Sequence, residues 1–184
     1  SPFDYLMEHV LRVEIPELPE EVYELSPLDR GSLVHETLDE FLREVLARNE
    51  GPPAPATPWS ASDRARLHEI AEAQCARYEA LGLTGRRAFW DRDRRRIFAD
   101  LDRFLVEDAN TREAYGLTTL ATELRFGLPG AEWPAVELPL GDGRLLRFRG
   151  AADRVDGNGT DLLVIDYKTG KSFGVGDGDD PTAA

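Results

Sequence analysis

The sequence Leu-Leu-Val-Ile-Asp-Tyr-Lys-Thr-Gly, residues 162–170, joins four apolar residues to a charged segment. Four consecutive apolar residues indicate a strand that is buried on both faces and is therefore central in its sheet. Asp166 and Lys168 follow almost at once, and charged side chains beside a central strand are costly unless they have a use. The stretch predicts a functional site at the end of a central strand.

The residues before this strand predict a hairpin that brings a second carboxylate to it. Asn158-Gly159 is a strong signal for a two-residue hairpin turn, which pairs residue 157 with residue 160. In that register Asp166 lies opposite Ala151, and Asp153 is one diagonal step away. Since side chains alternate between the two faces of a strand, Asp153 and Asp166 are expected on one face.

Two carboxylates and the Lys168 ammonium on one face suit a hard divalent cation. Diagonal neighbours are separated by about 7 Å at their Cβ atoms, a spacing from which two carboxylates can close on one Mg²⁺ or Mn²⁺. Such a cation orients water and polarises a phosphoryl oxygen, and Lys168 would stabilise developing negative charge. The plainer alternative is a cross-strand ion pair between Asp153 and Lys168. The apolar strand before Asp166 favours the functional interpretation.

Hydrophobic periodicity predicts a helical half followed by a sheet. Spacings of three and four residues predict three helices, over residues 30–48, 62–81 and 89–110. Asp29 is the expected N-cap of the first helix. Alternation then predicts an antiparallel meander of strands over residues 118–127, 135–140, 144–155 and 162–168. The expected architecture is a single α+β or α/β domain over residues 1–184.

Composition excludes several classes of protein. The 184 residues are 41% hydrophobic and 31% charged, which fits one globular domain and excludes collagen, coiled coil and wholesale disorder. No stretch approaches the roughly 20 apolar residues of a membrane span, and no signal peptide pattern is visible, so we expect a cytoplasmic protein without a membrane partner. Cys75 is the one cysteine, which excludes an internal disulfide and a cysteine-rich metal site.

The net charge of −13 argues against a nucleic-acid partner, but the charge is unevenly distributed. The first fifty residues hold thirteen acidic residues and four arginines, whereas residues 86–96 hold six arginines and two aspartates. The arginine run suits either a solvated helix face with acidic partners or a track for DNA phosphates. The candidate DNA contacts are Arg86, Arg87, Arg94, Arg95, Arg96 and, beside Asp153, Arg154, which could instead pair with Asp156.

Three motifs together resemble one family. Asp166-Tyr-Lys-Thr-Gly170 after a hydrophobic strand, preceded by Gly150-Ala-Ala-Asp-Arg-Val-Asp156, strongly resembles the PD-(D/E)XK nuclease superfamily in its RecB- and AddB-like branch. Arg30-Gly-Ser-Leu-Val-His35 is similar to the Gly-x-x-x-His signature of that branch, and Ser1-Pro-Phe-Asp-Tyr-Leu6 resembles the segment that begins these domains. The motifs occur in the family's order, from residue 1 to about residue 171.

The resemblance implies a restriction-endonuclease-like α/β core, with a mixed central sheet and flanking helices. It implies a deoxyribonuclease dependent on Mg²⁺ or Mn²⁺, an exonuclease of recombination or repair that works with a helicase domain or subunit. The implied metal ligands are His35, Asp153, Asp166 and the carbonyl of Tyr167. Lys168 would be the catalytic lysine, acting with Asp153 and Asp166. Glu123 matches a glutamate on an early strand less securely, and it could equally face solvent.

The sequence also departs from the family's pattern. AddB-like members often carry four cysteines that bind an iron–sulfur cluster, and with Cys75 alone no such cluster is expected. The Gln-x-x-x-Tyr helix that usually follows the last motif is not found, so we expect a fragment of a longer helicase-associated polypeptide. Two other classes stay open. One is a non-catalytic DNA-binding or scaffolding module with a nuclease fold, and the other is a metal-dependent hydrolase of small phosphorylated substrates.

Overall fold

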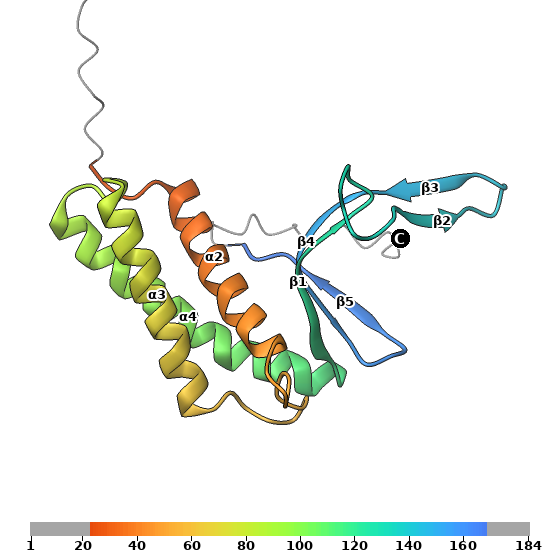
Figure 1. Ribbon diagram of the computed structural model, residues 1–184, viewed down its shortest axis with the longest axis horizontal. Coiled ribbons are helices and arrows are strands. Elements are labelled where there is room, and N and C mark those ends of the chain that lie inside the picture. Colours follow the sequence, from red (N-terminus) through yellow and green to blue (C-terminus); the bar gives the residue numbers. More distant parts are fainter. Residues whose placement is uncertain (1–22, 169–184) are drawn as a thin grey trace, which may run out of the picture.

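The computed structural model describes residues 23–168, in which a layer of helices is followed by two small antiparallel sheets (Figure 1). The helices are α2 (Pro27–Leu46), α3 (Ala61–Ala80) and α4 (Arg87–Tyr115). The strands are β1 (Thr118–Phe126), β2 (Val136–Pro139), β3 (Leu145–Phe148), β4 (Gly150–Gly157) and β5 (Leu162–Ile165). The predicted α/β class is confirmed. The motif segments Ser1–Leu6 and Thr169–Gly170 lie outside the described residues.

Local capping signals explain where the helices begin and end. The predicted cap of α2 at Asp29 is wrong, because Ser26 is the N-cap and its Oγ accepts a hydrogen bond from the Asp29 N–H at 3.0 Å. Pro27 fits the first helical position, where no backbone N–H is needed. Helix α4 continues past residue 110 and ends at Gly116. This glycine adopts the left-handed backbone conformation, with φ of 63°, that commonly ends helices.

The hydrophobic core lies among the three helices. Its fully buried members include Phe41 and Leu42 of α2, Leu67 of α3, and Ile97 of α4. These positions recur at helical spacing, so one face of each helix is apolar. The packing gives α2 a rigid support, and α2 presents its other side to β1, where the Thr122 hydroxyl donates to Asp39 at 3.0 Å.

Cys75 is buried in this core, and burial raises the pKa of its thiol from 9.0 to about 11. We expect iodoacetamide at pH 8 to label the folded chain about 100-fold more slowly than the unfolded chain. The reagent attacks the thiolate, and the higher thiol pKa lowers the thiolate fraction about 100-fold. The neutral thiol stabilises the fold fully below pH 9 and loses this effect as the pH rises through about 11. Equal labelling rates with and without denaturant would contradict this expectation.

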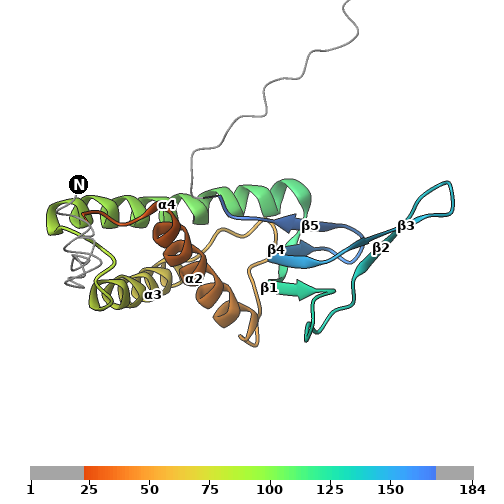
Figure 2. The same cartoon turned by 90° about the horizontal axis from the view of Figure 1, so that it is seen from above.

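The two sheets diverge at a junction that the sequence did not reveal. Strands β1, β4 and β5 form one antiparallel sheet in that order, and β2 pairs only with β3 in a hairpin that extends away from the helices (Figures 1 and 2). The single strand predicted over residues 144–155 is therefore wrong, because it divides into β3 and β4. At the junction a Cβ on Gly127 would lie 2.8 Å from Arg149 and Ala135 side chains, so glycine permits the close approach.

The hairpin of β4 and β5 has a longer loop than predicted. Gly157 pairs with Leu162 and Arg154 with Ile165, which leaves residues 158–161 as a four-residue loop. Asn158 closes this loop, because its Oδ1 accepts the N–H groups of residues 160 and 161 at 2.9 and 2.8 Å. The predicted register is wrong by two residues. A slip of two residues preserves the face of every paired side chain. The pairing ends at Ile165, so the common face of Asp153 and Asp166 stays a prediction.

Strand β5 is not central within the described sheet. It pairs with β4 alone, and Leu162 and Val164 are 71% and 65% exposed. The prediction of a strand buried on both faces is therefore wrong for residues 23–168. All pairs between the named strands are antiparallel there, so the parallel pairs of a mixed sheet are not among them. No helix of the described part has the length and apolar character needed to cross a membrane.

Candidate metal centre

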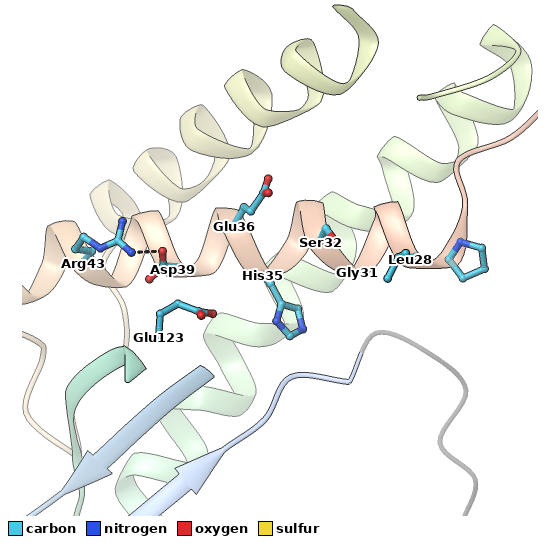
Figure 3. Close-up of a pocket in the computed structure, with 9 residues that line it drawn as sticks. Leu28, Gly31, Ser32, His35, Glu36, Asp39, Arg43 and Glu123 are labelled. Atoms are coloured by element: carbon cyan, nitrogen blue, oxygen red, sulfur yellow. Dashed lines mark hydrogen bonds and ion pairs between the residues drawn. The ribbon is translucent and has the colours of Figure 1, made fainter. Parts of the chain in front are cut away.

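Three metal-binding side chains from different elements meet beneath α2. His35 projects from α2, Glu123 from β1 and Asp153 from β4, and one potential ligand atom of each lies within 4.8 Å of the others. Figure 3 shows the imidazole of His35 and the carboxylate of Glu123 directed toward one another below the helix. The three residues are separated by up to 118 positions in the sequence, so only folding brings them together.

The backbone of Tyr167 orients two of these side chains. The His35 Nε2 lies 2.7 Å from the Tyr167 carbonyl oxygen, and since a carbonyl only accepts, Nε2 carries the proton. In the neutral ring Nδ1 then has the free lone pair, and it lies 3.5 Å from Asp153 Oδ2. The Tyr167 N–H donates to the same Oδ2 at 2.7 Å. The backbone of Tyr167, in the segment after β5, thus holds both His35 and Asp153 in place.

Glu123 stands in unusual backbone geometry among other acids. Its φ of 49° is positive, between the pairs Thr122–Arg154 and Leu124–Ala152 that hold β1 against β4. Burial, then the charges of Asp39 and Asp153, raise the pKa of the Glu123 carboxyl. A lone pair on imidazole and two crowded carboxylates form a donor set that fits a divalent cation, which would offset their repulsion.

Asp166 and Lys168 form an ion pair with each other at the exposed end of β5. The Lys168 ammonium lowers the pKa of the Asp166 carboxyl, and Asp166 in turn raises the pKa of Lys168. The alternative ion pair between Asp153 and Lys168 is therefore not the one formed. Asp166 lies outside the group of close ligand atoms in the described residues, although a side-chain hydrogen bond with Asp153 also lowers the pKa of its carboxyl.

A hollow of about 690 Å³ opens beside His35 and Glu123. It runs along α2, and its lining includes Leu28, Gly31, Ser32, His35, Asp39 and Glu123 (Figure 3). Gly31 and Ser32 lie one turn before His35 and have small or absent side chains, which leaves room next to the imidazole. The site thus has space for part of a substrate beside a candidate cation position.

Comparison with known proteins matches the sequence to a family. The sequence profile described as the PD-(D/E)XK nuclease superfamily matches residues 1–177. The chain belongs to this superfamily. Its helices and antiparallel sheets are consistent with the restriction-endonuclease-like fold of the PD-(D/E)XK nucleases.

Curated relatives of this superfamily member are each named as a subunit of an ATP-dependent helicase/deoxyribonuclease. The protein of Lacticaseibacillus casei is 32% identical over 186 residues, which cover 92% of this chain and 14% of the relative. The protein of Acetivibrio thermocellus is 26% identical over 187 residues, covering 96% of this chain and 15% of the relative. The chain thus spans about one seventh of the length of these relatives.

The arginine run of this PD-(D/E)XK member follows α4 with acidic partners. Arg87 lies 3.9 Å from Asp91, Arg96 lies 4.0 Å from Asp93, and Arg94 pairs with Glu72. The Arg86 guanidinium lies over the Tyr23 ring, and Arg95 is exposed. None of these five arginines lines the hollow beside His35. The pairs are those of a solvated helix face, while Arg86, Arg87, Arg95 and Arg96 keep cationic groups at the surface.

Arg154 is buried, with 1% of its surface exposed. Its Nε and one terminal nitrogen each donate to Asp156 at 2.6 Å, and its other terminal nitrogen lies 2.5 Å from Asp108. Of the two roles that the sequence left open, the structure shows the ion pair with Asp156. The interpretation of Arg154 as a DNA contact is wrong in this conformation, because its guanidinium has no surface to offer a phosphate.

Sequence reasoning missed Asp39 as part of this site. Asp39 lies four residues after His35, on the same helical face, and it lines the hollow beside Glu123. Its spacing from the histidine was the available signal. The environment of Glu123 was also left open by the sequence, since only the pairing of β1 with β4 places it opposite Asp153.

Proposed function

We propose that this chain is the nuclease domain of a longer helicase-associated polypeptide and hydrolyses DNA phosphodiesters with the help of Mg²⁺ or Mn²⁺. The observation that carries the proposal is the convergence of His35, Glu123 and Asp153 on one point beside an open hollow. The relatives support DNA as the substrate and a helicase as the partner, because their name combines helicase and deoxyribonuclease. A role in recombination or repair, in the cytoplasm, accords with that combination.

His35, Glu123 and Asp153 would hold the cation, with Asp166 and the Tyr167 carbonyl as further oxygen donors. The cation would supply a Lewis acid for a phosphoryl oxygen and lower the pKa of a bound water. The Nε2–H bond from His35 to Tyr167 keeps the Nδ1 lone pair aimed at the carboxylates. The Tyr167 N–H restrains Asp153 in the same orientation.

Lys168 would stabilise the negative charge that develops on the phosphate. Its ammonium is protonated at neutral pH, Asp166 raises its pKa further, and its side chain is exposed where a DNA strand can reach it. Exposed arginines of α4, namely Arg86, Arg87, Arg95 and Arg96, would contact the DNA backbone without reading sequence. We also propose that the cleavage is exonucleolytic, because a partner helicase would deliver a DNA strand progressively to the hollow.

Exposed apolar residues support the fragment interpretation. Leu162 and Val164 of β5 and Leu120 of β1 are all more than half exposed. Side chains of this kind at a sheet surface are costly to leave in water, by about 25 cal/mol per Å². A further part of the domain, outside residues 23–168, would bury them. The coverage of about one seventh of the relatives accords with a larger polypeptide.

The proposal is tested with labelled single- and double-stranded DNA in Mg²⁺, Mn²⁺ or EDTA, using this chain and a version extended past Ala184. We expect degradation that EDTA abolishes, and end-labelled linear DNA should be degraded while circular DNA is spared. Circular DNA cut equally well would contradict the exonuclease assignment. DNA binding without cleavage by either version would indicate a scaffold, and hydrolysis of small phosphorylated substrates alone would indicate the third class.

Lys168→Ala separates catalysis from cation binding. Because a protonated ammonium has no lone pair to offer a cation, we expect Mn²⁺ affinity to stay within about twofold while cleavage falls about 100- to 1,000-fold. The measurements are a Mn²⁺ titration followed by electron paramagnetic resonance and a single-turnover cleavage rate. Unchanged cleavage by Lys168→Ala would contradict the role assigned to this ammonium.

A further inference from the structure

Four charged side chains are buried together on the side of β4 that faces α4. Arg112 and Arg154 are 0% and 1% exposed, and the two carboxylates among them belong to Asp108 and Asp156. Buried guanidinium groups are tolerated only where carboxylates and hydrogen bonds compensate for the loss of water. These four residues, defined here as the buried charge cluster, are thus held in one arrangement.

Arg154 joins two elements within this cluster. It binds Asp156 of its own strand through two bonds of 2.6 Å and reaches across to Asp108 of α4 at 2.5 Å. A planar guanidinium that is bonded along two edges has one orientation. The position of β4 relative to α4 is accordingly set by this one side chain.

The chain passes directly from Arg154 to a ligand of the candidate metal centre. Asp153 precedes Arg154 on β4, and adjacent strand residues project to opposite faces. The ion pairs hold the Arg154 side chain on the side of β4 that faces α4. They therefore also fix the direction in which Asp153 projects from the opposite side, toward His35 of α2.

A path of ring contacts leads from Arg154 to a second ligand. The guanidinium lies 6.0 Å from the centre of the Phe104 ring, which meets the Tyr167 ring edge-on at 5.8 Å. The Tyr167 ring meets the His35 imidazole edge-on at 5.7 Å. Tyr167 also binds both ligands through its backbone, as its N–H donates to Asp153 and its carbonyl accepts from His35.

We propose that Arg154 is a positioning residue, which sets the geometry of the metal centre by fixing β4 and the ring of Tyr167. The inference rests on the proposed cation site at His35, Glu123 and Asp153. Arg154 touches neither the cation position nor the hollow, so it acts only through Asp153 and Tyr167.

Arg112 provides a matched control. It is equally buried and also binds Asp108, through its Nε at 2.9 Å. Its other bonds go to the carbonyl oxygens of Ala54 at 2.8 Å and Thr57 at 3.0 Å, in the loop between α2 and α3. It therefore belongs to the same cluster but supports a loop rather than β4.

The experiment compares Arg154→Lys with Arg112→Lys in the full chain. Thermal unfolding and the Mn²⁺ dissociation constant are measured for each, the latter well below the unfolding midpoint. Both variants should unfold at lower temperature. Arg154→Lys should weaken Mn²⁺ binding at least about tenfold, and Arg112→Lys should leave it within about twofold.

Several results would overturn the inference. Wild-type Mn²⁺ affinity in Arg154→Lys, or equal weakening in both variants, would leave Arg154 with a structural role only. A wild-type chain that binds no Mn²⁺ would refute the cation site itself, and the positioning role with it. If Arg154→Lys does not fold, Asp156→Asn replaces it, since it keeps the side-chain volume and the contact between Arg154 and Asp108. The expected result for Asp156→Asn is a smaller loss of Mn²⁺ affinity, and no loss would overturn the inference.

Discussion

Asp153→Asn is expected to abolish DNA cleavage, with a loss of at least about 1,000-fold, and to remove most of the Mn²⁺ affinity. Asp153 is the residue at which the site's contacts meet, because its Oδ2 lies 3.5 Å from His35 Nδ1 and accepts the Tyr167 N–H. Asparagine has the same shape and can still accept that N–H, so the fold should survive. The substitution removes the negative charge that a cation requires.

The measurements for Asp153→Asn are a single-turnover cleavage rate in saturating Mn²⁺ and a Mn²⁺ titration. Asp142→Asn serves as the control, since Asp142 is an exposed acid in the turn between β2 and β3 and pairs with Arg144. The control should keep wild-type cleavage and affinity. Wild-type Mn²⁺ binding in Asp153→Asn would refute the assignment of Asp153 as a ligand.

Asp108→Ala is expected to lower the free energy of unfolding by about 3–5 kcal/mol, because it leaves buried positive charge without compensation. The Asp108 carboxylate accepts the Trp59 Nε1–H at 2.5 Å and the Arg112 Nε–H at 2.9 Å. It also lies 2.5 Å from Arg154. Alanine leaves three donors short of a partner, namely the half-buried Trp59 in the loop before α3 and the buried Arg112 of α4 and Arg154 of β4.

Asp102→Ala is the comparison for this prediction. Asp102 lies on the same helix and also has two basic partners, Arg64 at 2.6 Å and His68 at 2.8 Å. Its ion pairs are at the surface, where water and salt screen them. Asp102→Ala should therefore lower the free energy of unfolding much less than Asp108→Ala does. Urea unfolding of both variants gives the two free energies. Equal losses would show that the buried charge cluster contributes no more than a surface pair.

The two predictions probe sites joined by a single step along the chain. Asp153 presents its carboxylate to the candidate cation, and Arg154 anchors the same strand to Asp108. The motif Asp-Arg-Val-Asp of residues 153–156 therefore combines a proposed ligand with two members of the buried charge cluster. The resemblance to a nuclease family implies the ligand role of Asp153. The burial of Arg154 and Asp156 indicates that these two residues hold the strand in place.

Local pattern alone was enough for the α/β class and for the approximate bounds of the three helices and of the strands β1, β2 and β5. Periodicity and motif order are properties of neighbouring residues, so they survive without knowledge of the fold. The wrong register of β4 and β5 left the face of each paired residue unchanged, since a slip of two residues restores each side chain to its face.

Contacts between distant residues decided everything else about the site. The loop of residues 158–161 and the division of the 144–155 strand both depend on which strand pairs with which. The meeting of His35 with Glu123 and the burial of Arg154 require α2 and α4 to pack beside the sheet. The sequence does not distinguish the buried Arg154 from the exposed Arg95, because a side chain loses its water only once the chain has folded.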